Sequence, residues 1–307
     1  MDFNGNYMSD SKVDIVEKCI RLMVSTKSPI INYSKIKEFV KAVINIGYLR
    51  TNAYHNHMHA YEVLENVTYM ARFTDLSPEN VFLLQIAALC HDIDHLGIKN
   101  SDRYPPEFIK YNSYDSITEI SSSSSYNEYD HIQFTTNLLT HHKNIFKSKQ
   151  RDMDDMLNTI NCLIMSTDLS LHQHYTEFIK KRLFLSQSLE KESFSFAKMI
   201  LMLKLADVGH IVFRNFNIHL GWVLKRYQEE GDDFADIAEV AQDTVGFVNG
   251  FVDSLVNIFH ILHPEFEAPI KTYNRNISIW KTYAQNKTCG EKKQPIGSSV
   301  VGTPLCA

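Results

Sequence analysis

The chain has 307 residues, of which 44% are hydrophobic and 22% are charged, with 15 Tyr, 18 Phe and 2 Trp. This composition excludes a chain that is disordered throughout, because the apolar content suffices for a packed core. The net charge of −5, without a Lys/Arg stripe, argues against a nucleic-acid polymer as a partner. No apolar run approaches the roughly 18 residues of a membrane helix, so we expect no membrane span.

Apolar residues recur at three- and four-residue steps along most of the chain, which predicts helices, the first two over 11–25 and 35–48. A third helix is expected to begin at Ser77-Pro78, where a capping hydroxyl precedes a proline in the first turn. Its residues 81–90 are apolar nearly all round, which predicts a central position. Further helices are predicted at about 128–146, 150–166, 174–186, 195–211, 214–230, 233–262 and 265–285.

Two stretches lack this period. Residues 100–127 contain Pro105-Pro106 and a run of serines, and are interpreted as an irregular insertion. Residues 286–307 are polar and are expected to form a disordered tail. Because we find no alternating strand pattern and no repeat, the sequence predicts one compact all-α domain over 1–285.

The five cysteines are scattered without paired spacing, which is typical of reduced thiols and favours a cytoplasmic protein. The sequence does not define the oligomeric state, and a homo-oligomer stays open.

The 14 histidines are the most distinctive feature of the chain. In Tyr54-His55-Asn56-His57-Met58-His59, two histidines are four residues apart, so a helix would place His55 and His59 on one face. That spacing can direct two imidazoles to one site. A pair of capping or surface histidines is the alternative.

A second cluster, His91-Asp92-Ile93-Asp94-His95, follows the most apolar predicted helix. Buried charges are costly unless they are paired or bound to metal, so a purely structural role is difficult to explain here. Asp207 likewise interrupts an apolar helical run, although an ion pair would also explain it. Two imidazoles and two carboxylates would form an open metal site, and they are His59, His91, Asp92 and Asp207.

The order of the motifs H-N-x-x-H-A, H-D-x-D-H-x-G and A-D-x-x-H resembles the class I cyclic-nucleotide phosphodiesterases. These belong to the metal-dependent phosphohydrolases that are built on a His-Asp pair. Supporting matches are Ser166-Thr167-Asp168-Leu169-Ser170-Leu171-His172, Val245-Gly246-Phe247 and His263-Pro264-Glu265. The resemblance covers about residues 50–285. It implies an all-helical catalytic domain with a two-metal pocket between its helices, which hydrolyses 3′,5′-cyclic nucleotides to 5′-monophosphates.

The resemblance also implies roles for individual residues. The ligands of a tightly held metal, usually zinc, would be His59, His91, Asp92 and Asp207. Asp92 would also bridge to a second ion, usually magnesium or manganese, and His55 would be the general acid. The supporting groups would be His95, Thr167 and Glu128, of which Glu128 would orient His55 or a metal-bound water. The substrate-binding residues would be Tyr54, Phe247, His210 and Thr244, with Phe247 stacking on the base.

One departure from the family pattern concerns the base. The family usually carries a glutamine at the position of Thr244, and a threonine hydroxyl offers fewer hydrogen bonds than an amide. Gln242 lies about 200° further round a helix and is poorly placed to substitute. Losing one such hydrogen bond typically costs ~1–3 kcal/mol, so we expect altered purine recognition and leave the choice between cAMP and cGMP open.

Two other functions stay open at this point. The chain could be a catalytically silent cyclic-nucleotide sensor or interaction module on the same fold, which the Thr244 departure supports. It could also be a phosphohydrolase that acts on another nucleotide. Retention of His55 and of all four ligand residues argues against the silent module, and the combined H-N-x-x-H and V-G-F motifs weigh against another phosphohydrolase.

Overall fold

The computed structural model describes residues 11–103, 125–147, 152–185, 191–232 and 236–285. Within these ranges the chain forms helices, and the only strand-like pairing is an isolated bridge between Ile31 and Phe146. The prediction of an all-α fold is confirmed. Residues 286–307, and residues 104–124 of the expected insertion, lie outside the described residues. The single-domain boundary at residue 285 therefore stays a prediction.

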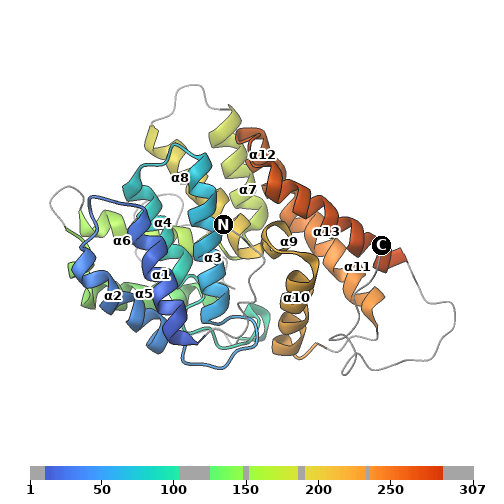
Figure 1. The fold of residues 1–307 in the computed structure, drawn as a ribbon, viewed down its shortest axis with the longest axis horizontal. Coiled ribbons are helices and arrows are strands. Elements are labelled where there is room, and N and C mark those ends of the chain that lie inside the picture. Colours follow the sequence, from blue (N-terminus) through green and yellow to red (C-terminus); the bar gives the residue numbers. More distant parts are fainter. Residues whose placement is uncertain (1–10, 104–124, 148–151, 186–190, 233–235, 286–307) are drawn as a thin grey trace.

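The first part of the chain forms the helices that are drawn from blue to green in Figure 1. They are α1 (Lys12–Ser25), α2 (Tyr33–Ala42), α3 (His57–Met70), α4 (Pro78–Cys90), α5 (Tyr126–His141) and α6 (Met153–Met165). Short turns of helix lie between them, namely η2 (Val43–Gly47), η3 (Ala71–Phe73), η4 (Asn100–Asp102) and η6 (Lys143–Ile145).

The second part continues across the molecule to the helices drawn in orange and red. It comprises α7 (His172–Lys180), η7 (Lys181–Leu185), α8 (Lys191–Val208), α9 (His210–Phe213), α10 (Phe216–Glu230), α11 (Ile237–Phe247), η8 (Val248–Val252), α12 (Asp253–Leu262) and α13 (Glu267–Gln285).

Helix α4 begins and packs as its sequence predicts. Ser77 Oγ accepts a hydrogen bond from the backbone N–H of Asn80 at 3.2 Å, and Pro78 is the first helical residue. Every residue from Val81 to Cys90 is buried. The helix packs against α3, α6 and α8, so the predicted central position is confirmed.

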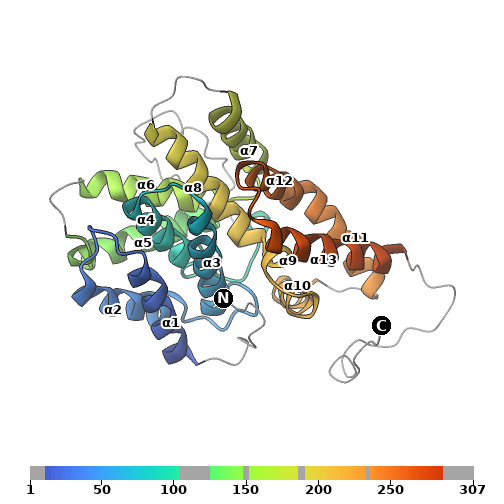
Figure 2. The ribbon, with the colours of Figure 1, turned by 45° about the horizontal axis from the view of Figure 1, so that its top comes forward.

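Helix α8 is the second central element, and Figure 2 shows it crossing the middle of the molecule. It contacts α3, α4, α7 and α12. The beginning of α3 and the ends of α4 and α8 carry the three predicted ligand motifs. The packing of these three helices therefore positions the site.

The predicted helix over 195–211 is interrupted at Gly209, which separates α8 from α9. A Cβ atom at Gly209 would lie 2.0 Å from the carbonyl oxygen of Leu205, so the backbone leaves no room for a side chain. The prediction for 233–262 is also refined, because α11 passes into α12 through a π-helical turn at Val248–Val252. The predicted helix over 128–146 ends at His141.

The helix Ile237–Leu262 is long and apolar enough to cross a membrane by length and composition, contrary to our expectation that no stretch of this kind exists. Within the fold, α11 packs against α13 and α12 packs against α8. A core helix passes the same test of length and composition. The finding is therefore weak evidence for a span, and the absence of a span stays a prediction.

Candidate active site

Four side-chain atoms from three helices meet in one cluster. His59 lies in the first turn of α3, the pair His91-Asp92 directly follows α4, and Asp207 lies in the last turn of α8. His59 Nε2 is 3.1 Å from Asp207 Oδ1 and 3.4 Å from Asp92 Oδ2. His91 Nε2 is 3.1 Å from Asp92 Oδ2 and 3.4 Å from Asp207 Oδ1. The structure thus brings all four predicted ligand residues together.

This cluster, called the ligand cluster below, fits a divalent cation. Asp92 Oδ2 is buried and has no hydrogen-bond partner among the described residues. His91 Nδ1 lies 2.9 Å from Ala88 O, and donation to this carbonyl leaves the Nε2 lone pair facing the cluster. Zinc bonds of about 2.0–2.2 Å to nitrogen and oxygen place neighbouring ligand atoms roughly 3.0–3.6 Å apart. The observed separations agree with this.

The two carboxylates of the ligand cluster are ionised. Burial alone would raise the pKa of Asp92 and of Asp207. With no cation bound, the surrounding histidines, His91 foremost, together outweigh burial and hold the pKa of both groups well below its usual range. The cluster therefore offers negative charge to a cation.

The chain immediately before α3 places His55 outside the helix. The helix begins at His57, and Asn56 is its N-cap, which accepts hydrogen bonds from the backbone N–H groups of Met58 at 2.9 Å and of His59 at 3.3 Å. The expectation that His55 and His59 share a helix face is therefore wrong. Asparagine is among the strongest N-capping residues, and its side chain sets the start of the helix here.

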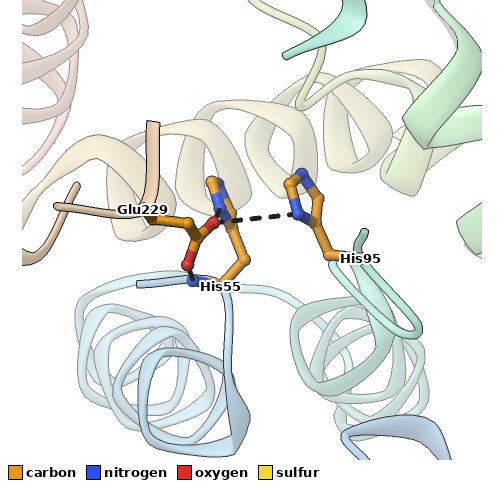
Figure 3. A group of neighbouring side chains, drawn as sticks. All are labelled: His55, His95 and Glu229. Atoms are coloured by element: carbon orange, nitrogen blue, oxygen red, sulfur yellow. Dashed lines mark hydrogen bonds and ion pairs between the residues drawn. The ribbon is translucent and has the colours of Figure 1, made fainter. Parts of the chain in front are cut away.

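Glu229, in the last turn of α10, holds His55 in place (Figure 3). Its Oε1 contacts His55 Nδ1, and its Oε2 accepts the backbone N–H groups of Tyr54 at 2.6 Å and of His55 at 3.1 Å. His95 stacks on the His55 ring with centroids 3.8 Å apart. Asn52 Nδ2 donates to the carbonyl oxygens of His55 at 3.1 Å and of His95 at 2.7 Å. The imidazole is thus fixed in position and orientation.

These surroundings favour the protonated form of His55. Burial lowers the pKa of its ring, but the charge of Asp92 and the hydrogen bond to Glu229 outweigh burial and raise the pKa above its usual value. His95 behaves oppositely, because burial lowers its pKa to about 2. Its Nδ1 accepts the backbone N–H of Gly97 at 2.9 Å. Of the two stacked rings, His55 is the one that can deliver a proton near neutral pH.

Glu229 was not among the residues predicted from the sequence. The residue belongs to the charged run Lys225–Glu230 at the end of a predicted helix, which resembles an ordinary solvated helix end. Its role follows from the position of the end of α10 beside the loop before α3, and no local pattern encodes that position. Together with His55 and His95, Glu229 also has the spacing of a metal site. However, Glu229 already pairs with His55, and His95 Nδ1 is occupied by Gly97.

The second oxygen of Asp92 faces another buried histidine. Asp92 Oδ1 lies 4.0 Å from His131 Nε2, and His131 Nδ1 donates to Ile93 O at 2.7 Å. The His131 ring stacks beside that of His95, with centroids 5.5 Å apart. Asp92 therefore contributes one oxygen to the ligand cluster and directs the other toward the side of His131.

Glu128 and Thr167 line the same cavity as His55. Glu128 accepts a hydrogen bond from Asn100 Nδ2 at 2.8 Å, and burial together with the charge of Asp168 raises its pKa to about 7. Its described side-chain partner is Asn100 and not His55. Thr167 Oγ1 donates to Ile164 O at 2.8 Å, so this hydroxyl is used within its own turn.

A cavity of about 390 Å³ opens over these groups, within the size range of small-molecule sites. It is lined by ten of the residues predicted from the sequence, namely Tyr54, His55, Asp92, His95, Glu128, Thr167, Asp207, His210, Thr244 and Phe247. The two remaining predicted residues, His59 and His91, are fully buried. Trp222 and His219 of α10 also line the cavity, and neither was assigned a role from the sequence.

The wall formed by α11 carries the expected base pocket. Thr244 is buried, and its Oγ1 donates to Val240 O at 2.7 Å, so its proton is already used inside the helix. Phe247 lines the cavity and packs against Phe251 with centroids 5.0 Å apart. Gln242 is exposed and donates to Ala284 O at 3.3 Å, which agrees with our expectation that it is poorly placed to substitute for the missing amide.

Comparison with known proteins agrees with this geometry. A sequence model of the 3′5′-cyclic nucleotide phosphodiesterases matches residues 54–234, which is more than half of the chain. The chain therefore belongs to this family. The matched region contains the four ligand residues as well as His55 and Glu229.

The individual relatives share only about a quarter of the aligned residues with this chain. The chain is 25% identical over 264 residues to the dual specificity calcium/calmodulin-dependent 3′,5′-cyclic nucleotide phosphodiesterase 1C of Mus musculus, covering 77% of this chain and 35% of that protein. It is 25% identical over 199 residues to the 3′,5′-cyclic-nucleotide phosphodiesterase regA of Dictyostelium discoideum, covering 62% of this chain and 24% of that protein. The chain thus spans about a third or less of the length of these relatives.

The fold resembles a solved phosphodiesterase domain. The phosphodiesterase domain of the rhodopsin phosphodiesterase from Salpingoeca rosetta superposes with a TM-score of 0.75 at 19% identity, covering 92% of each chain. At this identity the likeness concerns the fold alone.

Proposed function

We propose that this chain hydrolyses 3′,5′-cyclic nucleotides to nucleoside 5′-monophosphates. One observation carries the proposal. Asp92 and Asp207 of the ligand cluster line one cavity of suitable size together with His55. Membership of the phosphodiesterase family supports this assignment of reaction class.

We infer a zinc ion at the ligand cluster, held by His59, His91, Asp92 and Asp207. A second divalent ion, magnesium or manganese, would bind near the other oxygen of Asp92. When bound, such ions act as Lewis acids on phosphoryl oxygens and lower the pKa of water to about 7. The donor chemistry of the cluster supports zinc, since imidazole and carboxylate are both common zinc ligands.

His55 acts as the general acid in the proposed reaction. An oxygen from water bonds to phosphorus, and the bond from phosphorus to the ribose 3′-oxygen breaks. His55 gives its proton to that oxygen and regains one from the proton that the water releases. Glu229 stabilises the charged imidazole before transfer and holds its orientation throughout. Such acid catalysis is typically worth ~10²–10⁴-fold in rate.

The base would lie between the apolar walls of the cavity, with Phe247 offering a stacking surface. Thr244 donates its proton to Val240 O, so its oxygen can only accept a hydrogen bond from a base. It cannot reproduce the donor and acceptor pair of an amide. We therefore propose weaker discrimination between adenine and guanine than a glutamine at this position would give.

The scattered cysteines support a reducing, cytoplasmic setting for the reaction, since Cys19, Cys90 and Cys162 are all free thiols. We therefore propose that the protein acts in the cytoplasm. The oligomeric state stays open, and a homo-oligomer is one possibility.

The test is release of 5′-monophosphate from cyclic AMP and cyclic GMP, measured with magnesium, with manganese and with a chelator. We expect turnover of at least one nucleotide that the chelator abolishes and added metal restores. No turnover of either, with zinc still bound, would contradict the proposal and support the silent sensor module. Hydrolysis of a different phosphate ester alone would support the third alternative.

A further inference from the structure

His210 connects the ligand cluster to a buried carboxylate. Its Nε2 lies 3.2 Å from His59 Nδ1, the ring nitrogen of His59 that faces away from the cluster. Its Nδ1 lies 3.0 Å from Glu62 Oε2. All three residues are less than 5% exposed. The sequence assigned His210 to substrate binding, but in the structure both of its ring nitrogens face protein groups.

Glu62 is itself anchored as a charged group. It lies one turn after His59 on α3, and its Oε2 is 3.5 Å from Nε of the buried Arg214. Arg214 Nη2 also donates to Glu65 Oε2 at 2.8 Å. Burial alone would raise the pKa of Glu62, but the charge of Arg214 and the neighbouring His210 lower it to about 2. Behind the ligand cluster there is therefore a fixed negative charge.

One arrangement of protons satisfies every contact in this chain of residues. His59 Nε2 faces the ligand cluster, so its lone pair is directed there and Nδ1 carries the proton. That proton can be donated to His210 Nε2, and the proton on His210 Nδ1 then faces Glu62 Oε2 at 3.0 Å. A neutral imidazole offers one donor and one acceptor, which this arrangement requires.

The position of His210 is fixed by the backbone and by packing. It is the first residue of α9, directly after Gly209, where a Cβ atom would collide with Leu205 O. The indole ring of Trp222 stacks on the His210 ring with centroids 5.0 Å apart and an interplanar angle of 18°. The imidazole is therefore held between two elements.

From this geometry we propose that His210 and Glu62 are positioning residues, which hold His59 in the tautomer and orientation that bind metal. The proposal rests on the metal site of the proposed function. A carboxylate or carbonyl that accepts the outer N–H of a ligating histidine is a recurrent feature of metal sites, and its loss typically costs 10–100-fold in metal affinity. Here His210 lies between the ligating His59 and the carboxylate of Glu62, so the connection contains one more residue.

The experiment measures zinc affinity of the whole chain by competition with a chromophoric chelator, in the absence of substrate. We compare wild type with His210→Ala and Glu62→Gln, where the second change keeps the side-chain size and removes the charge. The matched control is His219→Ala. His219 is also a buried cavity histidine on a neighbouring helix. Neither of its ring nitrogens has a hydrogen-bond partner in the described structure, whereas His210 Nε2 contacts the ligand residue His59.

We expect both test variants to bind zinc about 10–100-fold more weakly than wild type, while His219→Ala retains wild-type affinity. With cobalt(II) in place of zinc, the visible absorption bands should shift in His210→Ala and not in the control. Wild-type affinity in both test variants would overturn the proposal, as would an equal loss in all three. A loss confined to His210→Ala would overturn the part assigned to Glu62. Because zinc affinity is read without turnover, wild-type zinc binding without hydrolysis would refute the proposed function alone.

Discussion

Glu229 and His55 are joined by both side chain and backbone, although they are 174 residues apart in sequence. One carboxylate oxygen contacts the imidazole, and the other accepts the backbone N–H of His55. The same residue therefore sets the position of the histidine and raises its pKa. Proton donation by His55 thus depends on where α10 ends.

Removing the charge of Glu229 should change the pH profile of turnover. His55 must be protonated to act, and its raised pKa means that the active form persists to a higher pH than an ordinary histidine would allow. Activity should therefore fall as the pH rises through that raised pKa. In Glu229→Gln this alkaline limb should move to lower pH, with turnover at neutral pH roughly 10–100-fold lower.

The measurement is kcat against pH for wild type and Glu229→Gln at saturating metal. Glu230→Gln is a suitable control, because Glu230 is the next residue and pairs with Arg226 and Lys99 rather than with His55. An unchanged alkaline limb in Glu229→Gln would show that another group sets it.

Asp207→Asn should release the tightly held metal. Its Oδ1 is close to both His59 Nε2 and His91 Nε2, and a neutral amide removes the charge that a cation needs. We expect zinc content below half of the wild-type value after dialysis and loss of turnover. The measurement is metal analysis by mass spectrometry beside the activity assay. Full zinc retention would remove Asp207 from the ligand set.

Thr244→Gln should strengthen purine recognition, if the α11 wall is the base pocket. The amide offers a donor and an acceptor to the base edge, whereas the proton of Thr244 is already donated to Val240 O. One added hydrogen bond of ~1 kcal/mol would lower KM about fivefold for one nucleotide or both. Thr244→Val serves as the matched control, because it has the same shape without the hydroxyl. If Thr244→Gln left the KM for cyclic AMP and the KM for cyclic GMP unchanged, the base would bind away from Thr244.

Gly209→Ala should destabilise the fold. The new Cβ would lie 2.0 Å from Leu205 O, and a backbone carbonyl at the end of α8 can yield only if the helix moves. We expect a loss of about 1–3 kcal/mol in the free energy of unfolding, from denaturant titration. Gly246→Ala is the control, since a Cβ there meets nothing within 4 Å and should raise helix stability by up to ~1 kcal/mol. Equal stability of the two variants would contradict this reading of Gly209.

The sequence predicted what depends on local pattern. The start of α4 at Ser77-Pro78 and its buried course follow from capping chemistry and apolar content, and both are confirmed. Asp92 and Asp207 could be singled out because a carboxylate in an apolar helical segment requires a partner. The break at Gly209 and the π-helical turn in 237–262 were not predicted, because an apolar helical period continues across both positions.

The contacts that complete the site depend on tertiary packing. Glu229 reaches His55 because α10 ends beside the loop before α3. The residues next to Glu229 in the sequence do not predict this contact. His210 was recognised as part of a motif but was assigned to the substrate, because only the fold shows that it lies against His59 and Glu62. The start of α3 was mispredicted for a different reason, because the signal lay in the sequence itself. Asn56 carries a strong capping signal that the four-residue histidine spacing obscured.

The most direct test of the account separates acid catalysis from metal binding in a single variant. His55→Asn removes the proton donor and leaves the ligand cluster intact, so bound zinc should equal that of wild type while turnover of cyclic nucleotide falls ~10²–10⁴-fold. Metal content and 5′-monophosphate release are measured on the same preparation. Loss of zinc in step with activity would make His55 a ligand, and unchanged turnover would show that it is not the acid. Either result would contradict the account.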